Sequence, residues 1–408
     1  MLKISSDIFL IEKTNLTRAF FYIGILVAYW GTLLPWFFWS LSGVYYILSA
    51  IFIFTSFMLA RTLESPIFSR KDFQVPILAY LTLVITKNIV NGSNINSYIG
   101  LCFDACIFLS LFLLNLDELK KLMKFLCITM ASLLVVSIFF FILFLIGFPL
   151  PNTPLINEEL GYSFINYYFF MVYNDIYSLF MPRFSSVFLE PGHLGTASVL
   201  LLSTQIGLWK KWYNIVLIFT TLITFSLAAY VLFLLLSFQQ VWIRHKKILS
   251  KLLLLLAFFS LVAISSMIYN DGDNLINTLI IERLEVNDGK LSGDNRVTDK
   301  FEAEFNDYMQ SDDILLGRDY DWQDYGWGNA GYRVFIYDNG LLVLFLVIML
   351  YILMTLPSTD KRAVISMLIF GVASFWVRAN PITYYYFIPM YAFAYIGNNI
   401  NEKMDKKI

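Results

Sequence analysis

Long apolar runs separated by short polar breaks dominate the 408-residue chain. A helix that crosses a bilayer needs about 20 mainly apolar residues, and most runs approach that length. Consecutive apolar stretches such as Leu252 to Leu256 exclude the alternating pattern of an outer-membrane barrel. The pattern therefore predicts an all-α, polytopic integral membrane protein, a single transmembrane domain over residues 1–408 with about 12 transmembrane helices. The expected spans are 18–35, 41–60, 74–90, 98–115, 122–147, 190–208, 212–225, 227–242, 249–268, 334–354, 363–378 and 381–397.

Basic residues cluster between alternate spans, so that most of the 29 Lys and Arg fall on one side of the membrane. The positive-inside rule makes that side the cytoplasm and predicts that both termini are inside (N-in/C-in). Both ends of residues 212–242 are basic and are therefore expected on the cytoplasmic side. A single helix would put them on opposite sides, so two short helices that meet near 225–229 are expected. Two outer segments remain: an extracytoplasmic interfacial loop at 148–189, rich in aromatic residues, and a large acidic extracytoplasmic loop at 269–333. The latter is expected to contain a helix over Val297 to Gln310.

Composition makes the few charges informative, because 58% of the residues are hydrophobic and only 14% are charged. Ionisable groups at a membrane boundary are costly and are first read as functional. Arg183, Glu190 and His193 lie together at the outer start of the sixth span. In one reading Glu190 caps the helix that Pro191 begins, with Arg183 as its ion-pair partner. In the other, Glu190 is a catalytic base with His193 beside it on the first helical turn.

The large loop holds further candidates. Arg296 lies near the start of its expected helix, where the dipole disfavours a cation and invites an anionic partner, either a protein carboxylate or a phosphate. A solvated loop arginine is the other reading. Arg333 and Arg378 are further cations near the outer ends of spans. Aromatic and polar residues alternate between positions 319 and 333. The rings could stack on sugars and the polar groups could hydrogen-bond to them. An aromatic belt at the membrane interface is the other explanation. The candidate sugar-binding residues are Asp319, Trp322, Trp327, Asn329 and Tyr332.

Two charges inside expected helices, Lys87 and Asp104, lie at comparable depth, and an ion pair between them is favoured over a proton relay. There is no GK[ST] phosphate loop, and two histidines cannot form a His-rich metal set. No cofactor and no metal are therefore expected, and the energy for any reaction has to come from the substrate itself.

The chain resembles the Wzy-type bacterial polysaccharide polymerases (O-antigen, capsule or exopolysaccharide repeat-unit polymerases), related to the O-antigen ligases. The similar motifs are Arg183-Phe-Ser-Ser-Val-Phe-Leu-Glu-Pro-Gly-His193, Ser292-Gly-x-x-Arg296, Gly317, Asn329-x-x-Tyr332 with Asn339-Gly-Leu-Leu342, and Arg378-x-x-Pro381 with the tyrosines that follow. The topology is similar too, with one large outer loop before the last three spans.

The resemblance implies a glycosyltransferase of the bacterial cytoplasmic (inner) membrane, whose active site faces the periplasm. Its substrate would be an undecaprenyl-diphosphate-linked oligosaccharide, and the growing glycan would be transferred onto a new lipid-linked unit. Glu190, His193 and Arg296 would be catalytic, and Arg183, Arg296, Arg333 and Arg378 would bind the diphosphate. Membrane lipid, a chain-length regulator and a flippase are the implied partners, and nucleic acid is not one.

Three alternatives stay open at this stage. Ligases of the related group carry a functional histidine in the large loop, and residues 269–333 contain none, which favours a polymerase. A lipid-linked oligosaccharide flippase or transporter would line a central path with charges, whereas here the charges gather on the outer side. A non-catalytic scaffold or export partner would leave the outer arginines without a use.

Overall fold

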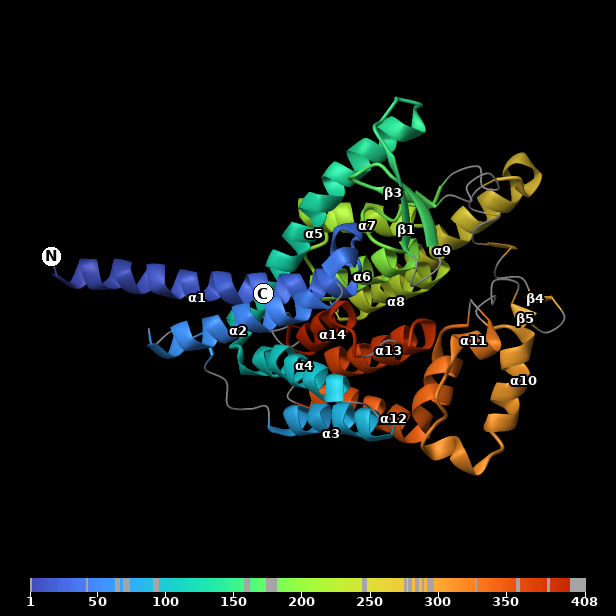
Figure 1. Cartoon of the computed structure of the whole chain (residues 1–408). Helices are drawn as coiled ribbons and strands as arrows, with labels where there is room; N and C mark the ends of the chain where they lie inside the picture. Colours follow the sequence, from blue (N-terminus) through green and yellow to red (C-terminus); the bar gives the residue numbers. More distant parts are fainter. Residues whose placement is uncertain are drawn as a thin grey trace.

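The computed structural model describes residues 2–41, 43–62, 67–68, 74–90, 95–157, 162–173, 182–243, 248–274, 277, 281–282, 286–287, 290–291, 297–326, 329–356, 360–379 and 382–396. Within these ranges the fold is mostly helical (Figure 1). Four helices are long and apolar enough to cross a membrane by length and composition: α2 (Val44–Thr62), α5 (Leu116–Leu145), α9 (Ile248–Ile268) with the turn after it, and α12 (Tyr332–Thr355).

Shorter apolar helices complete the bundle, and their bounds follow the apolar runs of the sequence. They are α3 (Gln74–Val90), α4 (Ile95–Leu113), α7 (Trp212–Ile223) and α8 (Leu227–Ile243). Large apolar side chains face outward on the bundle, and on α9 Leu249, Leu254 and Ile268 are each more than 70% exposed. An apolar surface of this kind is stable against lipid rather than water. The chain is a multi-pass membrane protein in this coarse sense, as expected.

Two short helices form the centre of the molecule. Nearly every residue of α6 (Pro191–Ser203) is buried, and so are Tyr384 to Ala392 of α14 (Tyr384–Ile396). The two helices pack on each other, and α14 also contacts α1 (Leu2–Thr32), α5 and α13 (Lys361–Val377). A helix that is apolar on all sides is stable only when protein neighbours or lipid cover it, and here protein neighbours do so. At 13 residues, α6 is about 20 Å long, shorter than a bilayer core.

Two local expectations are confirmed. The chain between residues 212 and 242 divides into α7 and α8, and the break contains Phe225 in a left-handed conformation (φ 45°). In the outer loop a helix, α10 (Asp299–Tyr308), forms within the expected stretch. Thr298 begins it as an N-cap whose side chain accepts a hydrogen bond from the Phe301 amide.

The all-α expectation needs a correction, because two of the segments between the helices also contain strands. β1 (Thr153–Asn157), β2 (Tyr162–Asn166) and β3 (Met171–Tyr173) form an antiparallel sheet within the first outer loop. Its register pairs Leu155 with Phe164 and Phe164 with Tyr173. Aromatic and β-branched residues suit strands, and here they signal a sheet rather than a free interfacial segment. β4 (Val286–Asn287) and β5 (Lys290–Leu291) form a second, two-stranded sheet.

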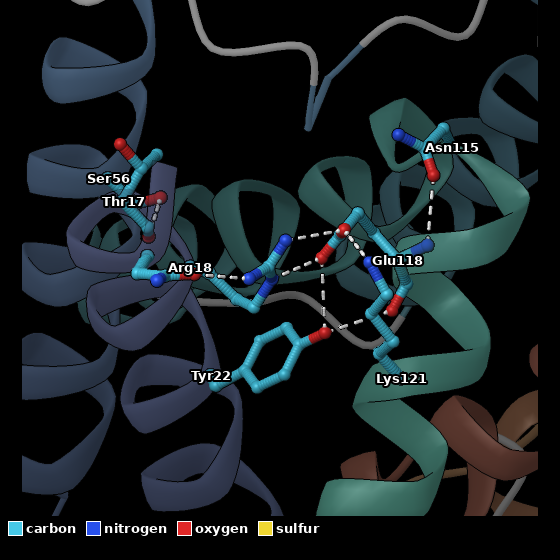
Figure 2. Close-up of polar contacts among 8 residues, drawn as sticks. Thr17, Arg18, Tyr22, Ser56, Asn115, Glu118 and Lys121 are labelled. Atoms are coloured by element: carbon cyan, nitrogen blue, oxygen red, sulfur yellow. Dashed lines mark hydrogen bonds and ion pairs between the residues drawn. The ribbon is translucent and has the colours of Figure 1, made fainter. Parts of the chain in front are cut away.

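A polar cluster fixes α1 to α5. The Glu118 carboxylate accepts hydrogen bonds from Arg18 Nε (2.7 Å) and Nη2 (2.8 Å), from Lys121 Nζ (2.7 Å) and from the Tyr22 hydroxyl (3.3 Å). Figure 2 shows these side chains converging on Glu118, with Asn115 bonded to the Glu118 amide at the start of α5. The carboxylate is buried, and its partners compensate its lost hydration.

The outer loop docks at the far end of the molecule from the start of α1 (Figure 1). α10 and the short helices η6 (Asp312–Leu315) and α11 (Trp322–Tyr325) pack there beside the beginning of α12. Tyr308 donates a hydrogen bond to the Ile336 carbonyl of α12 (3.0 Å), and the Arg318 amide donates to the Tyr337 carbonyl (2.6 Å). These contacts position the start of α12 for the site described next. The remaining short helices are η1 (Trp36–Leu41) and η3 (Tyr269–Gly272).

Candidate functional site

A buried extended segment leads into α6 and holds Glu190 in place. Residues 184–189 are each at most 4% exposed. Their backbone is bonded on several sides: the Met171 amide of β3 donates to Ser186 O (2.8 Å), and the Trp36 amide donates to Val187 O (3.0 Å). Ser186 adopts a left-handed conformation (φ 54°), which turns the chain before the helix. A segment fixed in this way leaves little freedom to the first turn of α6.

A cavity of about 400 Å³ lies at the start of α6. It is lined by groups from four parts of the chain that are distant in sequence. Two are cations, two are carboxylates, one is an imidazole and one is a carboxamide. The lining residues are Lys87, Glu190, His193, Ala330, Gly331, Val334, Phe335, Asp338, Asn339, Arg378 and Ala379. Three of the residues that the sequence singled out, Glu190, His193 and Arg378, are therefore brought together.

Glu190 occupies the N-cap position of α6, but its side chain makes no capping hydrogen bond. Its Oε2 accepts from Arg378 Nη2 (3.2 Å) and lies 3.7 Å from His193 Nε2, while Oε1 accepts from the Tyr162 hydroxyl (3.2 Å). Burial and the neighbouring Glu190 carboxylate raise the pKa of Tyr162 to about 12, so this hydroxyl stays protonated and donates. The carboxylate is thus oriented toward the cavity by two long-range partners rather than used as a helix cap.

Arg378 reaches this position because Gly192 has no side chain. A Cβ atom at Gly192 would overlap Arg378 Nη2. The guanidinium therefore lies directly against the first turn of α6, which only glycine permits. Arg378 itself is the C-cap of α13, and its amide donates to Ser374 O (2.8 Å). A cation at a helix C-terminus is favoured by the helix dipole.

The cavity also receives the N-termini of two helices. α6 begins at Pro191 beside Glu190, and α12 begins at Tyr332 beside Gly331, both at the lining. First-turn amides have no carbonyl partner within their own helix and attract anions. His193 Nδ1 is buried and has no hydrogen-bond partner among the described residues. The lining therefore combines two helix N-termini with a carboxylate and an imidazole.

Two predicted diphosphate-binding arginines lie elsewhere. Arg183 Nε donates to Thr224 O (3.2 Å), at the break between α7 and α8, so Arg378 and not Arg183 pairs with Glu190. Arg333 pairs with Glu302 of α10 (3.5 Å) and lies over the ring of its neighbour Tyr332. Both cations contribute to docking between segments rather than to the lining of the cavity.

The predicted sugar-binding residues are dispersed. Asn329 accepts from the Thr298 amide (2.6 Å) and donates to Tyr325 O (3.3 Å), so its side chain is used to position α10. Tyr332 stacks on Trp376 at 4.1 Å, and Asp319 is exposed. Trp322 begins α11, but its side chain lies outside the described part of the structure. Arg296 and Trp327 also lie outside the described residues.

The two described residues Lys87 and Asp104 attract each other electrostatically, but they do not form the expected direct ion pair. Asp104 accepts a hydrogen bond from Tyr384 of α14, whereas Lys87 lines the cavity. Sequence reasoning missed Asn339 and Tyr162 as site residues, and it gave Asp338 no role of its own. Asp338 and Asn339 did stand out as polar positions inside an apolar run, which is a usable signal. Tyr162 carried none, because its role depends on the fold of the sheet.

No family model, no curated protein and no solved structure matches this chain.

Proposed function

We propose that the chain polymerises lipid-diphosphate-linked oligosaccharide units at the outer face of the bacterial cytoplasmic membrane. In this reaction a sugar hydroxyl of one undecaprenyl-diphosphate-linked unit attacks the anomeric carbon of the glycan on another. The new glycosidic bond forms as the bond from the anomeric carbon to the phosphate oxygen breaks. The diphosphate leaves with the electron pair, and the hydroxyl proton passes to a base. The glycosyl-diphosphate bond supplies the energy.

One observation carries the proposal: residues 188 positions apart, Glu190 and Arg378, meet at one cavity together with His193. Negative charge develops on the departing diphosphate, where preorganised cations and helix N-termini lower the barrier most. Arg378, Lys87 and the starts of α6 and α12 supply such groups. Glu190 is the candidate base, and hydrogen bonds from Tyr162 and Arg378 hold its carboxylate in position.

The ion pair between Glu190 and Arg378 suggests how the site changes when substrate enters. An Arg-bound carboxylate is a weak base, because proton uptake would cost the ion pair. A diphosphate carries more negative charge than the carboxylate and competes for the guanidinium. Substrate binding would then free Glu190 to accept the hydroxyl proton.

The test uses cells in which the protein is replaced by Glu190→Gln or Arg378→Gln. Loss of a general base lowers the rate by about 10²- to 10⁴-fold, and loss of one transition-state donor by about 10²- to 10³-fold. Both variants should therefore accumulate lipid-linked single units and lose long polymer, as seen by gel electrophoresis and mass spectrometry. Arg61→Gln is the matched control, because Arg61 is exposed at the end of α2 and should support normal polymer.

A reconstituted assay separates a polymerase from a ligase. Purified protein in proteoliposomes, given only lipid-linked units, should form polymer without added nucleotide. Long polymer in both variants, or transfer by the wild type only to an added, different acceptor, would contradict the polymerase assignment.

A further inference from the structure

The α12 wall of the cavity differs chemically from the wall that holds Arg378. α12 is interrupted at Gly340, whose φ of 74° and ψ of 170° are not helical. Asp338 and Asn339 occupy the last turn before this break, and both line the cavity. Their side chains therefore meet whatever occupies the space next to Glu190 and Arg378.

The side-chain oxygen of Asn339 accepts no hydrogen bond from the described residues. Its Nδ2 donates to Phe335 O (3.0 Å) and to Asp338 Oδ2 (2.9 Å). Because both partners are acceptors, the orientation of the amide is determined, and the nitrogen has to face them. The other atom, Oδ1, is buried and has no partner among the described residues, although Asn339 is only 2% exposed. A buried carbonyl without a donor is unfavourable until a ligand supplies one.

Asp338 adds a second acceptor beside it. The Asp338 carboxylate accepts hydrogen bonds from Asn339 Nδ2 and from the Tyr320 backbone, and it lies near the Lys87 ammonium. Together with the neighbouring Asn339 carboxamide it places oxygen acceptors at the cavity lining. Such a wall repels phosphate and requires a ligand that donates hydrogen bonds. A small cation is the weaker candidate, because the Lys87 ammonium already lies in the same cavity. Vicinal hydroxyl groups of a sugar supply two donors at neighbouring positions.

We propose that Asp338 and Asn339 form a carbohydrate subsite, which binds the hydroxyl groups of the sugar next to the diphosphate. This assignment rests on the polymerase function proposed above. It divides the cavity into a cationic part for the diphosphate, formed by Arg378, and an acceptor part for the sugar, formed by α12.

The experiment measures initial polymerisation rates in proteoliposomes against the concentration of lipid-linked unit purified from Glu190→Gln cells. Inorganic pyrophosphate is the probe of the cationic part. Asp338→Asn and Asn339→Leu should raise KM about tenfold or more, because each removes a buried acceptor. Their inhibition constants for pyrophosphate should stay within about twofold of the wild type. For Arg378→Gln the measurement is equilibrium binding of the lipid-linked unit. In this variant pyrophosphate should compete less well with the unit than it does in the wild type.

Asn88→Leu is the matched control for Asn339→Leu. Asn88 also donates from Nδ2 to the carbonyl four residues before it (Val84 O, 2.8 Å), but it does not line the cavity. The KM of the Asn88→Leu variant should equal that of the wild type. Asp338→Glu keeps the carboxylate and should restore KM to within about threefold, which separates a subsite from a purely structural role.

The outcomes are distinct. A wild type that polymerises while Asp338→Asn and Asn339→Leu keep a normal KM would overturn the subsite alone. An equal rise in KM and in the pyrophosphate constant would also overturn it, because that would indicate general damage to the cavity. A wild type without polymerase activity would overturn the proposed function, and the subsite with it.

Discussion

Gly192 is the residue on which the geometry of the cavity depends most directly. Arg378 contacts Glu190 only because it crosses the first turn of α6 where a side chain is missing. The requirement is steric and involves no charge, so it can be tested without removing an ionisable group.

Gly192→Ala should displace the Arg378 guanidinium and lower polymer formation by about 10²-fold, because misplacing a stabilising group by about 1 Å has effects of this size. Activity in proteoliposomes is the measurement. Gly100→Ala in α4 is the matched control, since a Cβ there would meet nothing within 4 Å. Equal loss in both variants, or none in Gly192→Ala, would contradict the role given to the close approach.

At the scale of the element, α12 combines an apolar span with a break that the outer loop fills. Gly340 is left-handed, and a Cβ there would overlap the Leu315 carbonyl. Gly317 of the loop lies against the same part of α12. A Cβ at Gly317 would be 2.7 Å from Gly340 N and 2.8 Å from Asp338 O. The backbones of the loop and of the helix break are therefore in direct contact, and this contact requires glycine at both positions.

Gly340→Ala should lower the free energy of unfolding by about 2–4 kcal/mol, because it adds backbone strain and an overlap that cannot relax. Gly326→Ala should cost only about 1 kcal/mol, since Gly326 is also left-handed (φ 84°) but has nothing within 4 Å of its Cβ position. Thermal unfolding in detergent and limited proteolysis of the outer loop would measure this. A similar loss in both variants would mean that backbone conformation alone, and not the contact, matters at Gly340.

At the scale of the whole molecule, the polar cluster around Glu118 joins α1 to α5 through two residues that are 100 positions apart, Arg18 and Glu118. α1 is also held by apolar packing and by hydrogen bonds to α2, such as Ser56 Oγ to Thr17 O (2.9 Å). Apolar packing alone does not determine how far α1 slides along α5. Directional bonds from Arg18 to a buried carboxylate fix that register. The expected topology, with both termini in the cytoplasm, remains a prediction, and this cluster would lie toward the cytoplasmic side.

Glu118→Gln should destabilise the protein by about 1–2 kcal/mol, less than for a fully buried pair because Arg18 is 25% exposed on its side chain. Asp117→Asn is the control, since Asp117 is exposed in the same first turn and should change stability by only about 0.5 kcal/mol. Unfolding midpoints in detergent compare the two. If Asp117→Asn were as destabilising as Glu118→Gln, the helix dipole and not the ion pair would be the cause.

Much of the helical framework could be predicted from the sequence, because burial in lipid or in a bundle acts on local composition. The run at residues 74–90 became α3 with the same limits, and the break near 225 was visible in the basic clusters that flank it. The small sheet could not be predicted in the same way. Its strands are short, and pairing such as Leu155 with Phe164 depends on partners in space.

The candidate site could also be predicted only in part. The sequence by itself determined that Glu190 and His193 lie at the start of a helix and that Arg378 ends another, because charges in an apolar chain are few and conspicuous. Only the tertiary structure decided that Arg378, not Arg183, meets Glu190, that Lys87 and Asn339 share their cavity, and that Arg333 and Asn329 are used to dock the outer loop. The physical reason is that hydropathy is a local property, whereas an ion pair between residues 188 positions apart exists only once the helices between them have packed.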